Sequence, residues 1–176
     1  MGQDQFCGQE DQESFHQEMP LKPKVYVETS IPSYLTAWRS RDIVIAGNQE
    51  TTREWWDRRE DFELFISEFV LEEASGGAPE AAERRLEVLS GIPEIEISEE
   101  VELIAQELLL HASLPPRAKI DPLHIAMAAI GGMDYLLTWN CAHIANPAFR
   151  SRIEAVIRSF GYEPPIICTP LELLEI

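Results

Sequence analysis

The segment from residue 123 to residue 130, LHIAMAAI, is apolar at almost every position. A helix with apolar side chains all round must be covered on most sides, so this pattern predicts a buried helix. Asp121 stands at its head, and Gly131 and Gly132 end it because glycine tolerates a positive φ. Residues 134–138 follow directly, and their lack of polar alternation predicts a central parallel strand. The chain therefore places a buried helix immediately before a buried strand.

Strand and helix patterns alternate along the rest of the chain. Short apolar runs predict further strands at residues 25–27, 62–66 and 166–168, and alternating apolar and acidic residues predict an edge strand at 92–97. Apolar residues at helical spacing predict helices at residues 43–59, 68–74, 80–89, 98–109 and 147–160. A short helix after the first strand would have Ser30 as its N-cap. This alternation is typical of an α/β fold with a mostly parallel sheet.

The length of 176 residues suits one domain with a substantial core. Residues 1–20 have few apolar side chains and cannot bury enough surface to order themselves, so they are predicted to be a flexible tail. Residues 21–176 then form a single domain. No apolar run reaches the length of a membrane span, and the amino terminus does not resemble a signal peptide. We therefore expect a cytoplasmic protein without membrane association.

The net charge of the chain restricts which nucleic acids it can bind. A formal net charge of −17 argues against nonspecific duplex binding, which needs clustered Lys and Arg to neutralise phosphates. Local positive charge could come from Arg39, Arg41, Arg53, Arg58 and Arg59.

Four oxygen-bearing side chains fall at comparable places in the predicted fold. Glu28 and Asn140 follow the carboxyl ends of two strands, where open α/β sheets have their ligand crevice. Glu73 shares the apolar face of helix 68–74, whereas Glu72 faces the other way, and Asp121 heads the buried helix. Oxygen ligands of this kind suit Mg²⁺, and a cation held by them can polarise a phosphoryl oxygen. Without a cation these carboxylates repel one another, so at least one pKa is expected to be raised.

Each of these residues also has a structural interpretation. Asp121 precedes Pro122, so it could be the N-cap of its helix, and Glu28 could cap a helix or pair with an arginine. Asn140 could close a turn. Glu73 has the weakest structural alternative because an unpaired carboxylate on an inward face is unfavourable.

Histidine and cysteine residues near the same positions offer other interpretations. His124 lies three residues after Asp121 on one helix face, and a lone histidine there is more often a hydrogen-bonded core residue than a ligand. Cys141 with His143 suggests a thiol nucleophile in a small-molecule enzyme, although neighbouring residues at a strand end point apart. The cysteines, Cys7, Cys141 and Cys168, fit neither a disulfide framework nor a zinc knuckle.

Five motifs, in order between residues 24 and 176, carry a family resemblance: YVETSIPSYL, SEFVLEEASGG, DPLHIAMA, DYLLTWNCAHIAN and PIICTPLELL. Together they resemble PIN-domain proteins of the VapC-like toxin kind. The resemblance implies a three-layer α/β/α sandwich with a mostly parallel sheet of four or five strands. It further implies a ribonuclease of a toxin-antitoxin system that depends on Mg²⁺ or Mn²⁺, a homodimer, and a small antitoxin protein as partner.

The resemblance also assigns residues. The family's acidic positions fall on Glu28, Glu73 and Asp121, which would hold the cation, and the fourth position falls on Asn140. Ser30 matches a small hydroxyl residue that assists such sites. In the family the first position is more often Asp, and the fourth is usually an acid. Because Asn140 is neutral, the site of this chain has one negative charge fewer. A rival hypothesis follows, in which a PIN-like domain has lost catalysis and serves as a binding or regulatory partner.

Thr138, at the end of the predicted central strand, is expected to support the site by tethering the backbone there.

Overall fold

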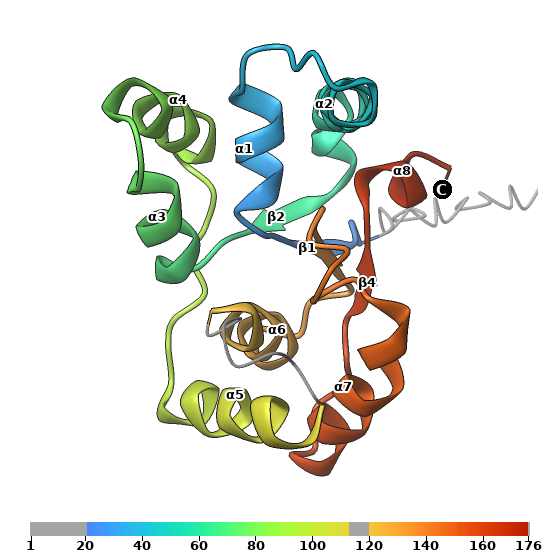
Figure 1. Cartoon of the computed structure of the whole chain (residues 1–176). Helices are drawn as coiled ribbons and strands as arrows, with labels where there is room; N and C mark the ends of the chain where they lie inside the picture. The colour runs from blue at the N-terminus through green and yellow to red at the C-terminus, as the bar shows by residue number, and fades with distance from the viewer. Residues whose placement is uncertain (1–20, 113–119, 176) are drawn as a thin grey trace, which may run out of the picture.

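The computed structural model describes residues 21–112 and 120–175, and its strands form one sheet in the order β2-β1-β3-β4 (Figure 1). All neighbouring strands are parallel, as predicted. The strands are β1 (Lys24–Val27), β2 (Glu63–Phe65), β3 (Tyr135–Leu137) and β4 (Ile166–Cys168). The predicted tail at residues 1–20 lies outside the described residues.

Helices cover both faces of this sheet, so the predicted α/β/α layering is confirmed (Figure 1). The first face carries α1 (Ser30–Thr36), α2 (Ile43–Asp57), α3 (Glu68–Ser75) and α4 (Pro79–Leu89). The opposite face carries α5 (Glu99–His111), α6 (Asp121–Ile130) and α7 (Pro147–Ser159). A short 3₁₀ helix, η1 (Arg59–Asp61), precedes β2, and α8 (Pro170–Leu174) follows β4. None of the helices in the described residues is both long and apolar enough to cross a bilayer.

The central strand β1 is buried from Val25 to Val27, and α6 is buried along most of its length, as its apolar sequence predicted. Trp55 of α2 is fully buried against Phe62, with a separation of 5.7 Å between ring centroids, and so belongs to the core. The chain leaves α6 through Gly132 at a φ of 64° and enters β3.

Two local predictions were wrong. Residues 92–97 form no strand beyond a single parallel bridge between Ile66 and Glu94. Pro93 has no N–H, and the acidic residues that follow are exposed, so pairing stops after one residue. Ser30 is not an N-cap either, because Thr29 occupies that position and makes no capping bond with its side chain.

The parallel register brings the carboxyl ends of β1 and β3 together. The amide of Glu28 donates to the carbonyl of Leu137 over 3.1 Å, and the amide of Thr138 donates to that of Cys168 over 3.0 Å. Residues that follow the strands therefore meet at one edge of the sheet, where α1, α3 and α6 begin.

Candidate metal centre

Glu28 is fixed at this edge by hydrogen bonds to one of its two carboxylate oxygens. Oε2 accepts from the Ser30 amide at 3.1 Å, from the Ser30 hydroxyl, and from Thr138 Oγ1 at 2.7 Å. Within the described part of the chain, Oε1 accepts no hydrogen bond. The side chain is almost fully buried, with a relative exposure of 6%. The carboxylate is thus immobilised with one oxygen left for a ligand, and the predicted supporting residues Ser30 and Thr138 lie in contact with it.

Glu73 of α3 has the same arrangement. Its Oε2 accepts from Thr29 Oγ1 at 2.6 Å and is 2.9 Å from His124 Nε2, whereas no group among the described residues donates to Oε1. The side chain is 32% exposed and points inward, while the neighbouring Glu72 is exposed, as predicted.

The pKa of Glu73 differs from expectation. Partial burial alone would raise it, but the hydrogen bonds from His124 and Thr29 outweigh burial and lower the pKa below its ordinary value. For this residue the shift is opposite to the predicted effect of carboxylate repulsion. Glu73 is therefore ionised at neutral pH, which is the form in which a carboxylate can bind a cation.

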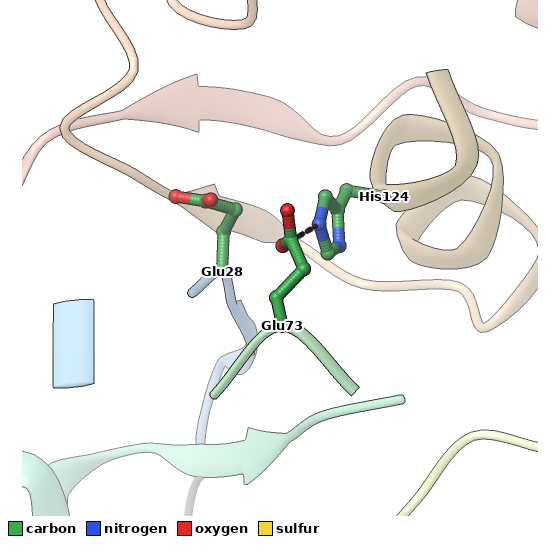
Figure 2. A group of neighbouring side chains, drawn as sticks. All are labelled: Glu28, Glu73 and His124. Carbon is green, nitrogen blue, oxygen red and sulfur yellow. Dashed lines mark hydrogen bonds and ion pairs between the residues drawn. The ribbon is translucent and has the colours of Figure 1, made fainter. Parts of the chain in front are cut away.

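His124 joins these two carboxylates from the buried helix α6. Its ring is 1% exposed, and its Nδ1 lies 2.8 Å from the hydroxyl of Tyr26, so the prediction of a hydrogen-bonded core histidine is confirmed. Figure 2 shows Glu28, Glu73 and His124 converging; Glu28 directly follows β1, and the other two residues belong to α3 and α6. Their potential ligand atoms lie within 4.8 Å of one another.

Asp121 does not belong to this close group. It is the first residue of α6, with Ile120 as N-cap, so its carboxylate is not a helix cap. Oδ1 accepts from Asn140 Nδ2 at 3.0 Å, and Oδ2 lies 2.8 Å from His143 Nδ1. The expected convergence of three carboxylates therefore holds for Glu28 and Glu73, while the loop after β3 holds Asp121 aside.

Asn140 both closes a turn and reaches Asp121. Its Oδ1 accepts from the backbone N–H of His143 at 3.2 Å, and its own backbone N–H donates to Thr138 Oγ1 at 2.9 Å. Since Thr138 also donates to Glu28, one hydroxyl links the Asp121 cluster to the Glu28 and Glu73 group. The sequence pattern pairs His143 with Cys141, whereas its position three residues after Asn140 is the signal for the turn that brings it to Asp121.

The pKa of Cys141 is raised by partial burial and by the nearby Glu172. A raised pKa keeps the thiol protonated and weakens it as a nucleophile. His143 is engaged with Asp121 and does not contact the thiol as a base. The geometry thus offers little support for thiol chemistry.

Comparison with known proteins places these residues in a recognised domain. The family model described as PIN domain matches residues 25–140, which include Glu28, Glu73, Asp121 and Asn140. A search of curated proteins gave no significant match. Among solved structures, the chain is similar to VapC20 of Mycobacterium tuberculosis, a toxin that cleaves the sarcin-ricin loop. The identity is 18% and the TM-score 0.49, and the alignment covers 64% of this chain and 86% of that one.

Proposed function

The chain belongs to the PIN-domain family, and from this premise we propose that it is a metal-dependent endoribonuclease, the toxin of a toxin-antitoxin pair. The observation that carries the proposal is the pair of immobilised carboxylates. Glu28 and Glu73 each have Oε2 saturated by donors, and their Oε1 atoms accept no hydrogen bond from the described residues.

This donor set fits Mg²⁺ or Mn²⁺. Hard divalent cations prefer oxygen ligands, and Mg²⁺ commonly takes only one or two carboxylates and keeps several waters. Such a cation supplies Lewis-acid catalysis of phosphodiester hydrolysis. Glu28 and Glu73 would bind it, Asp121 would complete the acidic site, and Asn140 would orient Asp121. Ser30 and Thr138 hold Glu28 in place.

The acidic surface limits where RNA can approach. Arg53 pairs with Glu50 at 3.2 Å and Arg58 with Asp61 at 3.7 Å, whereas Arg39 and Arg41 are exposed in the loop after α1. We assign phosphate contacts to these two exposed arginines. Further proposals are a small antitoxin protein as partner, a homodimer, and a cytoplasmic location.

Cleavage of RNA by pure protein tests the proposal. We expect cleavage in Mg²⁺ or Mn²⁺, none in chelator, and none from Glu73→Gln. Glu72→Gln is the matched control, because it makes the same change on the exposed side of α3 and should cleave normally. Cleavage that persists in Glu73→Gln would indicate a contaminating nuclease.

The neutral Asn140 at a position where the family usually has an acid favours a second candidate, a PIN-like binding domain without catalysis. It would bind RNA in Mg²⁺ without cutting it. RNA binding measured alongside cleavage separates the two.

A further inference from the structure

A chain of hydrogen bonds runs from the protein interior to Glu73. Ser67 Oγ lies 2.6 Å from the Tyr26 hydroxyl, that hydroxyl lies 2.8 Å from His124 Nδ1, and His124 Nε2 lies 2.9 Å from Glu73 Oε2. Ser67, Tyr26 and His124 are all essentially fully buried. Ser67 is the N-cap residue of α3, yet its side chain makes no capping bond. Its hydroxyl serves this chain instead.

When the imidazole of His124 is neutral, the chemistry of the partners sets the direction of each hydrogen bond. An ionised carboxylate can only accept, so His124 Nε2 must carry the proton that it donates to Glu73. In a neutral imidazole Nδ1 is then an acceptor, and the Tyr26 hydroxyl must donate to it. Burial raises the pKa of Tyr26, which keeps its hydroxyl protonated. The tyrosine oxygen in turn accepts from Ser67, and every group in the chain is satisfied.

The opposite arrangement is unfavourable. With the proton on Nδ1, the lone pair of Nε2 would face the carboxylate of Glu73 across 2.9 Å. Two acceptors at that distance repel each other, and both would lose a partner in a buried place.

We propose that His124 is a positioning residue, which holds Glu73 through Nε2–H and does not itself bind the cation, and that Tyr26 and Ser67 fix the required tautomer. This inference rests on the proposed metal-dependent function. It excludes His124 from the ligand set although its nitrogen lies within reach of both carboxylates.

The tautomer of His124 determines which atoms are available to bind a metal ion. With Nε2 protonated, the close group offers a cation carboxylate oxygen only. Such a set suits Mg²⁺ and Mn²⁺, whereas Zn²⁺ would gain from an imidazole ligand. Thr29 and His124 together hold Oε2, so Glu73 presents Oε1 in one orientation. Loss of partners that orient ligands typically lowers metal affinity by about 10-fold to 100-fold.

Two substitutions of His124 separate positioning from ligation by calorimetric titration with Mn²⁺. His124→Leu removes the N–H donor and should weaken Mn²⁺ binding by about 10-fold or more. His124→Gln keeps an amide N–H at a similar reach and should stay within a few-fold of wild type. Tyr26→Phe, which retains the ring, should bind Mn²⁺ more weakly than wild type. Its matched control is Tyr162→Phe, which loses a tyrosine bond to Glu100 of α5, and it should not change affinity.

A spectroscopic measurement on the intact protein reads the tautomer directly. Long-range ¹H–¹⁵N correlation should show His124 protonated at Nε2 alone, before and after addition of Mg²⁺. A proton on Nδ1, or loss of the Nε2 proton when Mg²⁺ binds, would overturn the proposal. Equal Mn²⁺ affinity in wild type and His124→Leu would also overturn it while leaving the proposed function intact. A wild-type protein that binds no divalent cation would refute the proposed function, and the tautomer would still decide whether this hydrogen-bond chain is correct.

Discussion

Glu73→Gln provides the sharpest test of how the metal-free site is stabilised. Mutual repulsion of carboxylates would make the substitution stabilising. Potential ligand atoms of Glu28 and Glu73 lie within 4.8 Å, and two unit charges at that distance repel by roughly 1 to 3 kcal/mol for a dielectric between 80 and 20. The Glu73 side chain is 32% exposed, so solvent screening favours the lower end of that range.

Hydrogen bonding acts in the opposite direction. Oε2 of Glu73 accepts two hydrogen bonds, and a bond to a charged group contributes roughly 1.5–3 kcal/mol against roughly 0.5–1.5 kcal/mol for a neutral one. In Glu73→Gln, a side chain whose amide oxygen keeps both hydrogen bonds would therefore lose about 2 kcal/mol of this stabilisation. The lowered pKa of Glu73 agrees that the fold favours the charged form. We therefore expect Glu73→Gln to destabilise the metal-free protein by about 1 kcal/mol, or roughly 2–4 °C in Tm.

The assay is a set of thermal melts in chelator, in Mg²⁺ and in Mn²⁺. A cation that binds only the folded state adds RT ln(1 + [L]/Kd), about 2.7 kcal/mol at a hundredfold excess over Kd, so wild type should gain roughly 5–10 °C. Glu73→Gln should gain much less, and Glu72→Gln should match wild type throughout. A Glu73→Gln protein that melts above wild type in chelator would refute this reasoning, because repulsion would then dominate.

Three further outcomes are expected. The stability difference between wild type and Glu73→Gln should be fully present above the ordinary carboxyl pKa of 4.5 and should disappear as the pH falls through the lowered pKa of Glu73, which urea unfolding at several pH values would measure. Thr138→Val removes a donor to the buried carboxylate of Glu28 and should cost about 1–3 kcal/mol in urea unfolding, whereas Thr138→Ser should cost much less; equal losses would exclude the hydroxyl as the cause. Asn140→Asp replaces the N–H that Asp121 accepts by a second carboxylate, so it should lower Tm in chelator and enlarge the Mg²⁺ response; an unchanged Tm would contradict this expectation.

The large elements could be predicted because their signals are local. The apolar segment that became α6 and the buried run that became β3 needed only hydrophobic periodicity. The inward orientation of Glu73 followed from helical spacing, since the same rule placed Glu72 in solvent. The parallel strand order then brought Glu28 to the same edge of the sheet as the start of α6.

The details of the site were not predictable in this way. Ser30, Ser67 and Asp121 stand at helix starts, where local rules assign such residues to capping, and none of their side chains caps a helix. These helices begin at the carboxyl edge of the sheet, so their first side chains meet partners from distant strands and loops. Ser67 bonds Tyr26, 41 residues away, and such a partner leaves no local pattern in the sequence.

Trp139 and Asn140, which lie just beyond β3, are anchored by side chains rather than by a neighbouring strand. The amides of Trp139 and Asn140 donate to the hydroxyls of Ser30 and Thr138, at 2.8 and 2.9 Å. Both hydroxyls also donate to Glu28. Solvent can therefore exchange these two amide protons only when the contacts around Glu28 open, so their exchange rates measure how often the site is disassembled in the folded protein.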